Sequence, residues 1–514
     1  MNRLQRDALP VIALVLVGSC AFINLMAIPA FEDEGSQLRW VWRLSESRDW
    51  LQSLGDGKPL EAWPMAPLLH LGVQPLLAIR AVHVLVGIIA ILLTYRLALR
   101  MTSRATAFVS ALLLALCPFL VYLQRFALSD ILLCASATWV LLSVLQLLEA
   151  PDLKRSVATA TALVLAAICK LPVGFVCMIS LPLALLLMPA EPRRALLRPP
   201  ALSRILLAFT PGALLALAII VMAVVRVRLG HPPGFGLSDL IGVGMGSYTD
   251  IAGTIGVARP TLLGELTAQL TWPVVSIGVV GLGVSAVSGD WRQRWLLCVG
   301  LVPMLIIGLL ARFWYSRYLL FTLPPLLVCA THGWQRLATA GSGRWRMAVS
   351  SGALVLCAVL MARQSALLIF NPIAARWSAL DRFQYFGGWG SGYGYPEAAN
   401  FIRATAPAPS MIYALDGHSA YQLRNYLPAP WRSRVESVFY GPDGRELRSQ
   451  QEKLRNVRDH APAWIIIAEP LLQRYLTSSF GETDSARVDV REIARFDKPA
   501  SVTKLALYQV VQIR

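Results

Sequence analysis

The stretch that decides the fold is residues 11–40, VIALVLVGSCAFINLMAIPAFEDEGSQLRW. Its apolar part, with the residues before it, is long enough to cross a membrane, because a spanning helix needs about 20 apolar residues. The run ends in three consecutive acids, Glu32, Asp33 and Glu34. Three adjacent like charges repel one another, and the repulsion grows at a low-dielectric boundary. The acids therefore either mark the outer end of a first span, hydrated and otherwise inert, or have a chemical task.

The distribution of charge divides the chain into two parts. Of its 514 residues 56% are hydrophobic and 15% are charged, whereas a soluble domain has about 25% charged residues. Residues 1–369 contain 45 charged side chains, about 12%, and residues 370–514 contain 32, about 22%, which is close to the soluble value. The sequence predicts a membrane domain over 1–369 and a water-soluble domain over 370–514.

The sequence indicates neither nucleic-acid binding nor a site built from cysteines. The net charge is +17, but the basic residues are scattered through short loops without a basic stripe or an aromatic reader motif, so no nucleic-acid partner is expected. The eight cysteines all lie in apolar segments and none forms a CxxC pair, so neither a disulfide framework nor a zinc site is expected.

Eleven apolar segments are candidates for membrane spans. They are approximately 8–30, 75–95, 105–123, 127–148, 156–171, 172–189, 205–225, 272–288, 295–311, 316–333 and 346–369. With the N-terminus in the cytoplasm, the inner segments hold 16 basic residues against five acids, as the positive-inside rule requires. This predicts a multi-pass protein of the cell membrane with a cytoplasmic N-terminus and an extracytoplasmic C-terminal domain.

Two long outer loops and the tail complete the predicted organisation. The loops cover 31–74 and 227–271, and in the first of them SQLRWVWRLSESRDWLQSL predicts an amphipathic helix in the membrane interface, or a lid helix without lipid contact. The tail alternates strands and helices, which indicates a small three-layer α/β domain. Its predicted strands are 410–416, 434–441, 463–469 and 504–513, and its predicted helices are 418–427, 444–461 and 469–480.

Charged residues recur at the predicted outer turns. QRFALSDILL contains Arg125 and Asp130, CKLPVGF contains Lys170, and ARFWYSRYLLFTLPPLL contains Arg312 and Arg317. Taken singly, each would be a structural ion pair or a snorkelling side chain. As a set on one side of the membrane they indicate function, because carboxylates suit a general base and basic groups suit an anionic lipid phosphate.

The motifs FEDEGSQLRW, GDGKPLEAWPMAPLL, RFALSDILL, CKLPVGF and YSRYLLFTLPPLL together resemble the polyprenyl-phosphate-sugar-dependent glycosyltransferases of the GT-C fold. This superfamily includes the protein O-mannosyltransferases and the lipid A aminoarabinose transferases. The resemblance covers about residues 8–333, and WGSGYGYPEAANFI in the tail resembles the region after the last span in bacterial members. It implies an α-helical polytopic membrane protein with about eleven transmembrane helices, followed by a small C-terminal α/β domain.

The resemblance also implies roles for the acids. Asp33 matches the first acid of the family's Asp-Glu pair and would be the catalytic base, while Glu34 would orient it or contact the acceptor. Asp130 matches the second acidic position. The resemblance thus implies that the sugar of a polyprenyl-phosphate-linked donor is transferred to a hydroxyl of a lipid, glycan or protein acceptor, with inversion at the anomeric carbon. No cofactor is expected, although Asp33 and Glu34 could hold one divalent cation.

The basic residues would bind the donor. Lys170 and Arg317 match the positions that hold the donor phosphate, and Arg125 would assist them. Lys58 lies in GKPLEAWP, which lacks the double proline usual in that element, and Arg312 is not at a motif position. A flippase or transporter of lipid-linked sugars is the alternative, but it predicts internal repeats and broken helices near the midplane, and the sequence shows no repeat.

Overall fold

The structure, a computed structural model, describes most of the chain as two compact units. The described residues are 3–47, 58–70, 73–228, 261–310, 315–340, 344–388, 390–406, 410–414, 417–437, 463–468, 488–499 and 504–513. Unit 1 comprises Met1–Leu25, Leu44–Leu71 and Ala78–Ser378, and unit 2 comprises Met26–Arg43, Gly72–Leu77 and Ala379–Arg514. Unit 2 thus holds residues 379–514 of the predicted domain 370–514, together with two segments of the predicted loop 31–74.

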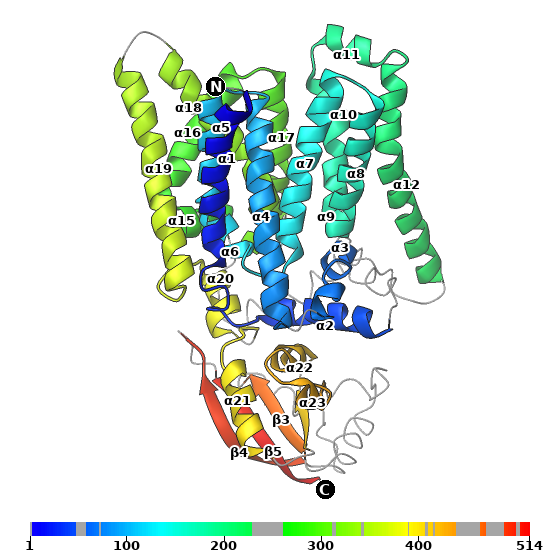
Figure 1. Ribbon diagram of the computed structural model, residues 1–514, viewed down its shortest axis with the longest axis vertical. Coiled ribbons are helices and arrows are strands. Elements are labelled where there is room, and N and C mark those ends of the chain that lie inside the picture. Colours follow the sequence, from blue (N-terminus) through cyan, green and yellow to red (C-terminus); the bar gives the residue numbers. More distant parts are fainter. Residues whose placement is uncertain are drawn as a thin grey trace. The chain divides into compact units, whose positions relative to one another are not determined.

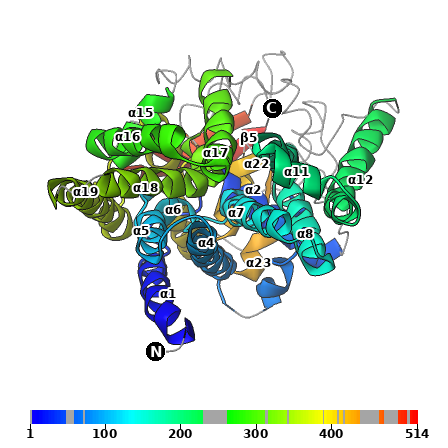
Figure 2. The ribbon, with the colours of Figure 1, turned by 90° about the horizontal axis from the view of Figure 1, so that it is seen from above.

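Unit 1 is helical, and its long helices run side by side along one direction (Figure 1). Seen from above, α1 and α12 run obliquely at the outside of this group of helices (Figure 2). The helices are α1 (Arg3–Ser19), α3 (Pro59–Ala62), α4 (Pro75–Leu99), α5 (Arg104–Ala115), α6 (Pro118–Leu123), α7 (Ser129–Glu149), α8 (Leu153–Cys169), α9 (Leu171–Val176), α10 (Ser180–Leu187), α11 (Ala190–Leu196), α12 (Ala201–Arg228), α15 (Leu262–Leu270), α16 (Trp272–Ser288), α17 (Trp291–Leu310), α18 (Leu323–Thr339) and α19 (Arg344–Phe370). Short 3-10 turns are η1 (Cys20–Phe22), η3 (Ala66–His70), η4 (Cys177–Ile179) and η5 (Ser316–Thr322).

The length and composition of these helices make the chain a multi-pass membrane protein. Among the described residues, α4, α7, α12 and α19 are long and apolar enough to cross a membrane, and the pair α15 and α16, bent by 114°, is a fifth candidate if it counts as one span. Each of the eleven predicted segments contains helix, although the number of crossings stays a prediction.

Prolines interrupt two of the predicted spans. Segment 105–123 divides into α5 and α6 at Pro118, and segment 316–333 divides into η5 and α18 just before Pro324 and Pro325. Proline lacks the backbone N–H that a continuous helix needs and clashes with the preceding turn. The first span is also shorter than predicted, since η1 ends at Phe22 and Asn24 has a φ of 51°.

Helix α7 is at the centre of unit 1. Of its most apolar stretch 83% is buried, against 22% for α12. It packs against α8 and η5, and α18 packs against α5, α16 and α17. Helices α16 and α18 approach closely at two glycines, because a Cβ on Gly333 would lie 1.9 Å from the carbonyl oxygen of Gly281.

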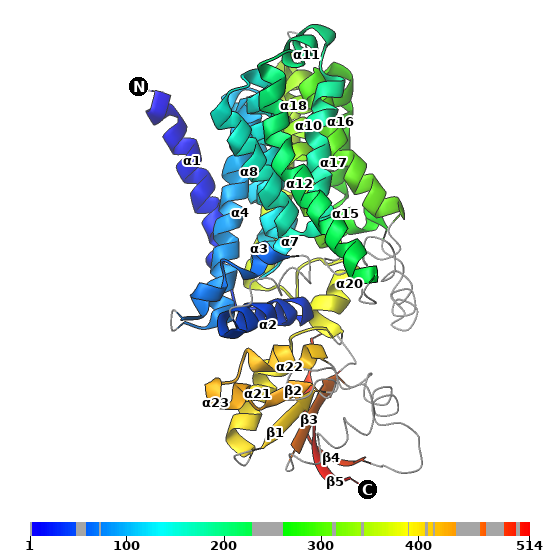
Figure 3. The same ribbon diagram turned by 90° about the vertical axis from the view of Figure 1, so that its right-hand side faces the viewer.

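Unit 2 contains a five-stranded sheet (Figure 3). Its strands are β1 (Met411–Ala414), β2 (Val435–Ser437), β3 (Ala463–Ala468), β4 (Val488–Asp497) and β5 (Lys504–Ile513), in the order β2-β1-β3-β5-β4. β1 is parallel to β2 and β3, whereas β5 is antiparallel to β3 and β4. Its helices are α20 (Ala379–Arg382), the π-helical turn η6 (Phe383–Gly387), α21 (Tyr395–Thr405), α22 (Gly417–Arg424) and α23 (Ala429–Arg432).

The tail thus has the predicted mixture of strands and helices. The strands predicted at 410–416, 434–441, 463–469 and 504–513 are each present over most or part of their length, and α22 corresponds to the helix predicted at 418–427. Strand β4 was not predicted. The predicted helices 444–461 and 469–480 lie outside the described residues, as does most of the predicted outer loop 227–271.

The amphipathic helix predicted after the first span is α2 (Glu32–Ser47), which buries Leu38, Val41 and Leu44 along one face. The three acids form its first turn, so they begin this helix and do not mark the outer end of the first span, which was one of the two readings left open. The reason is electrostatic, because a helix N-terminus carries a partial positive charge that stabilises acidic side chains.

Candidate functional site

A buried ion pair joins α7 to the end of α8. The Lys170 Nζ lies 2.8 Å from the Asp130 Oδ1, and the two side chains are 16% and 6% exposed. Asp130 stands in the first turn of α7, where the helix dipole favours an acid. A buried pair of this kind is weak evidence for stability, because removing two charges from water costs several kcal/mol per ion. Its position instead indicates a functional site.

The local sequence explains why Lys170 points here. Pro172 follows two residues later and cannot continue α8, so the chain turns at Lys170, whose φ and ψ are −157° and 93°. Helix α9 then lies directly against α8: a Cβ on Gly174 would be 1.9 Å from the carbonyl oxygen of Ala166. The motif CKLPVGF thus places a lysine at a tight corner between two helices.

An aromatic ring links Lys170 to the second predicted phosphate ligand. The Nζ of Lys170 is 4.4 Å from the centre of the Tyr318 ring, and the Cζ of Arg317 is 5.5 Å from the same ring and 4.5 Å from the Tyr315 ring. Arg317 is 7% exposed and lies in η5, which packs against α7. The structure therefore brings Asp130, Lys170 and Arg317 together, as the sequence predicted, and adds Tyr318.

The cluster contains an acid that the sequence analysis missed. Glu61 lies in α3, which packs against α7 and α8, and its side chain is 2% exposed. Burial raises the pKa of Glu61 from 4.5 to about 8; Lys58 and Lys170 oppose the rise and Asp130 adds to it. These interactions place Lys58, the predicted donor ligand at the start of α3, in the same group. The signal in the sequence was a lone acid within GKPLEAWP.

Arg125 makes a structural contact. Its guanidinium donates a hydrogen bond to the carbonyl oxygen of Asn24, and nearby Arg80 donates to the carbonyl of Leu25 at 3.0 Å. Burial, with the like charge of Arg80, lowers the pKa of Arg125 to about 10. The two arginines thus hold the segment that follows η1. A role for Arg125 at the donor phosphate stays a prediction, and Arg312 lies outside the described residues.

The acids of α2 belong to unit 2 and are held there by the tail. The backbone N–H of Glu32 donates to the carbonyl of Gly390 at 2.9 Å, and Gln422 donates to that carbonyl at 2.8 Å and to the Ala30 carbonyl at 3.2 Å. The N–H of Ala30 donates to the Tyr426 hydroxyl at 2.6 Å. Asp33 is half-buried at this anchored helix start. That Asp33 acts together with the lysine cluster of unit 1 stays a prediction.

Glu34 contributes to the start of the same helix. Its side chain is fully buried, and its Oε2 accepts a hydrogen bond from the backbone N–H of Phe31 at 3.4 Å. A glutamate three residues into a helix that accepts this bond is one half of a capping box. Among the described residues, no three His, Cys, Asp or Glu side chains gather as metal ligands do. A cation at Asp33 and Glu34 is therefore an untested expectation.

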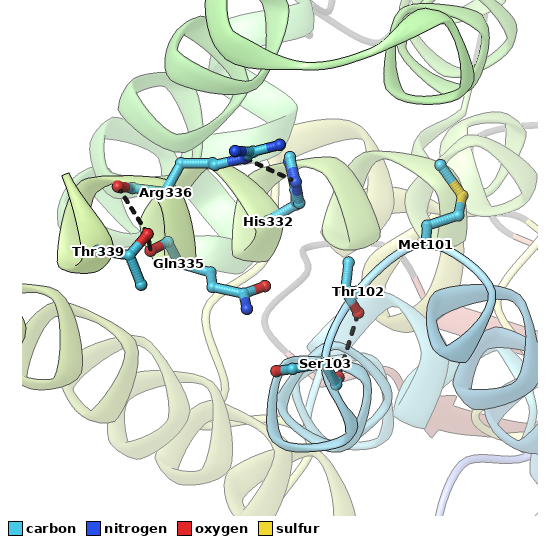
Figure 4. A pocket seen from close by; sticks show the side chains of 7 residues that line it. All are labelled: Met101, Thr102, Ser103, His332, Gln335, Arg336 and Thr339. Atoms are coloured by element: carbon cyan, nitrogen blue, oxygen red, sulfur yellow. Dashed lines mark hydrogen bonds between the residues drawn. The ribbon is translucent and has the colours of Figure 1, made fainter.

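A polar pocket of about 270 Å³ lies at the far end of α18 from Arg317. Figure 4 shows His332, Gln335, Arg336 and Thr339 of α18 facing the α4–α5 turn, which contributes Met101, Thr102 and Ser103. The Nε of Arg336 donates to the Nε2 of His332 at 3.4 Å. At about 1.5 Å per residue, His332 and Thr339 lie roughly 15 Å and 25 Å along α18 from the end of η5. The pocket is therefore distinct from the buried cluster.

Part of the chain matches a known family. Residues 56–226 match the model of the family described as dolichyl-phosphate-mannose-protein mannosyltransferase. This segment includes Lys58, Glu61, Asp130 and Lys170. No curated protein matches the chain in sequence.

The fold is that of solved GT-C enzymes. ArnT from Cupriavidus metallidurans matches over 99% of this chain and 98% of its own, at 14% identity and a TM-score of 0.61 in the apo state, and at 15% and 0.61 bound to undecaprenyl phosphate. An Archaeoglobus fulgidus oligosaccharyltransferase matches over 96% of this chain and 73% of its own, at 11% identity and a TM-score of 0.54. The resemblance read from the sequence motifs is thus confirmed, and at these identities the solved structures establish the fold.

Proposed function

We propose that this chain, with its GT-C membrane fold, is a glycosyltransferase that moves a sugar from a polyprenyl-phosphate donor to an acceptor hydroxyl on the outer side of the membrane. The observation that carries the proposal is the buried group of Asp130, Lys170 and Arg317 at one end of the helices. A site that buries this many charges suits a charged ligand. The ArnT structure solved with undecaprenyl phosphate supports a lipid phosphate as that ligand.

The cluster fits the donor phosphate chemically. Lys170 gives one hydrogen bond to Asp130 and has two further N–H donors, and the Arg317 guanidinium is a planar group suited to phosphate oxygens. Asp130 fixes the ammonium of Lys170 in place before the donor binds. The rings of Tyr315 and Tyr318 flank the two cations and limit their exposure to water, which strengthens their attraction for an anion.

In the proposed reaction the acceptor hydroxyl gives its proton to Asp33 and attacks the anomeric carbon of the donor sugar. The bond from that carbon to the phosphate oxygen breaks, and the lipid phosphate leaves with its negative charge stabilised by Lys170 and Arg317. Attack from the opposite face inverts the anomeric configuration. Glu34 serves this step by fixing the first turn of α2, on which Asp33 stands.

The divalent cation considered for Asp33 and Glu34 is not needed in this scheme. Since the Glu34 carboxylate already accepts the Phe31 N–H, we expect transfer activity to be unchanged when EDTA is added to the purified enzyme. A loss of activity on chelation that is restored by one divalent metal would assign a cation to the site. The control is the same EDTA treatment after saturation with calcium, which separates chelation from an effect of EDTA itself.

The deciding experiment is transfer by the purified protein in lipid nanodiscs, with polyprenyl-phosphate sugars and candidate acceptors, followed by mass spectrometry of the products. Asp33→Asn should lower turnover about 10²-fold or more while donor binding persists, because it removes the base and keeps the shape. Glu32→Gln is the matched control and should be nearly silent.

Two outcomes would contradict the proposal. Near-normal turnover of Asp33→Asn would remove the base assignment. Movement of the lipid-linked sugar across a vesicle membrane without transfer to any acceptor would favour a transporter. The orientation is tested separately with a reporter fused after Arg514, which should be active only if it functions outside the cytoplasm.

A further inference from the structure

Glu61 has an environment that the proposed mechanism does not use. Its carboxyl group is almost completely buried, and neither oxygen atom has a partner at normal hydrogen-bond geometry among the described residues. The hydroxyl of Ser129 is close enough to stabilise the carboxylate weakly, yet it too lacks a regular hydrogen bond. Buried polar atoms without partners are rare in native proteins and call for an explanation.

The surroundings of Glu61 are suited to an anion. Lys58 stands at the start of its own helix, and Lys170 comes from the end of α8. Helix α7 contributes its first turn, which contains Ser129 and Asp130. Among the described residues, no side chain caps this helix start. The unpaired N–H groups of a helix start favour a negatively charged ligand. The thiol of Cys169 also lies close enough to Glu61 to interact with its charge.

We propose that Glu61 is a donor-binding residue: its carboxyl O–H donates a hydrogen bond to an oxygen of the anionic phosphate that Lys58 and Lys170 attract. The inference rests on the proposed function, since the anion is the phosphate of the sugar donor. It adds a residue to which the sequence motifs assigned no role, and it adds a consequence for pH. The site accepts the phosphate only while Glu61 carries its proton.

The physical reason is competition for the same cations. When Glu61 is neutral it can donate to a phosphate oxygen, and both lysines attract the ligand. When Glu61 ionises it repels the phosphate and pairs with the lysines itself. Because burial raises its pKa to about 8, the neutral form dominates at pH values below this and is lost above it. Donor affinity should therefore fall as the pH rises through about 8.

The test is the affinity of farnesyl methyl phosphate for the full-length protein in nanodiscs. This diester carries one negative charge throughout the range, so the ionisation of the probe does not change. For the unmodified protein the affinity should fall roughly tenfold between about pH 7 and about pH 9, as the protonated fraction of Glu61 falls. Glu61→Gln keeps a hydrogen-bond donor and cannot ionise, so its affinity should be the same at both pH values.

Two variants complete the comparison. Glu61→Ala should bind more weakly than Glu61→Gln at every pH, because it lacks the donor, and should also show no pH dependence. Glu191→Gln makes the same chemical change on an exposed residue of α11, at the opposite end of the helices of unit 1 (Figure 1), and should retain the full pH dependence. Infrared difference spectra should contain a protonated carboxylic acid band near neutral pH that Glu61→Gln lacks.

The outcomes separate this inference from the proposed function. In one outcome the diester binds, Lys170→Ala lowers its affinity, and Glu61→Gln keeps the pH dependence of the unmodified protein. The proposed role of Glu61 would then be wrong, whereas the phosphate site would stand. A missing carboxylic acid band would equally overturn the role of Glu61. If the diester does not bind the unmodified protein at any pH, the phosphate site itself fails, and the inference fails with it.

Discussion

The two ends of α7 each carry an ion pair of nearly the same length in very different surroundings. At its start Lys170 lies 2.8 Å from Asp130, with side chains 16% and 6% exposed; at its end Arg100 lies 2.7 Å from Glu149, with side chains 42% and 25% exposed. Arg292 approaches the same Glu149 at 3.5 Å. The distance between the charges is therefore not what distinguishes the two pairs.

The difference lies in solvent and in the helix dipole. An exposed ion pair adds only about 0–1 kcal/mol to the free energy of unfolding, because water screens the attraction between its charges. A buried pair costs much to desolvate and is retained only where the charges are needed. Asp130 stands at the positive end of the dipole, which favours it, whereas Glu149 stands at the negative end and is stabilised by two arginines instead. Burial thus separates the candidate site from an ordinary surface contact.

The largest effect should follow from breaking the buried pair. Asp130→Ala leaves Lys170 charged and buried without its carboxylate, which should lower the free energy of unfolding by about 3–5 kcal/mol. Glu149→Ala, at the other end of the same helix, is the matched control and should cost about 1 kcal/mol or less. Reversible denaturation of both variants in detergent micelles measures the difference.

The buried pair can also be replaced as a whole. Asp130→Leu combined with Lys170→Met should be as stable as the unmodified protein or more stable, yet it should not bind the donor. Equal losses of stability for Asp130→Ala and Glu149→Ala would contradict the distinction between the two ends of α7.

The second prediction concerns affinity for the donor. Lys170→Ala and Arg317→Ala each remove a charge-assisted contact worth about 1.5–3 kcal/mol, which corresponds to roughly tenfold or more in affinity. Titration with a polyprenyl-phosphate analogue measures it. Arg292→Ala, at the other end of α7, should bind normally. Unchanged affinity in both variants of the cluster would move the phosphate site elsewhere in the protein.

The two ends of α7 also illustrate what the sequence could predict. Asp130, Lys170 and Arg317 were found because each is a charge inside or beside an apolar run, and such charges are rare. Glu61 was missed because the short segment Lys58 to Trp63 lies in a predicted outer loop, where a single acid is ordinary. Its burial depends on α3 packing against α7 and α8, a tertiary contact that no local pattern encodes. Tyr318 was missed because an aromatic ring at a span end usually marks the membrane interface.

The fold shows the same division between local and tertiary information. Hydropathy located the eleven helical segments, but not the break at Pro118 or the early end of the first span. Neither reading of the three acids included a helix start, because hydropathy cannot detect a helix that begins with polar residues. Strand β4, VDVREIARFD, does not alternate regularly and has irregular register with β5, so its place at the sheet edge depends on pairing with β5 rather than on a local pattern.

The third prediction tests the aromatic ring shared by the two cations. Tyr318→Leu removes the face that Lys170 and Arg317 approach, and it should weaken donor affinity about two- to fivefold, as expected for a cation–π contact of about 0.5–1 kcal/mol. Tyr318→Phe keeps the ring and should bind within about twofold of the unmodified protein. If the two variants lose affinity equally, the hydroxyl rather than the ring is the important group.

The smallest effect should come from the exposed end of α7. Arg100→Ala removes the 2.7 Å contact with Glu149 but leaves Arg292 at 3.5 Å from the same carboxylate, so the free energy of unfolding should change by less than about 1 kcal/mol. The residual effect should shrink further in salt, because the Debye length falls from about 10 Å at 0.1 M to about 3 Å at 1 M. For Asp130→Ala the loss should persist at 1 M salt, since salt screens a largely buried charge much less than an exposed one. Denaturation of both variants at the two salt concentrations makes this comparison directly. If the effect of Asp130→Ala falls with salt as much as that of Arg100→Ala, Asp130 and Lys170 are hydrated, and the distinction between a buried site and a surface pair does not hold.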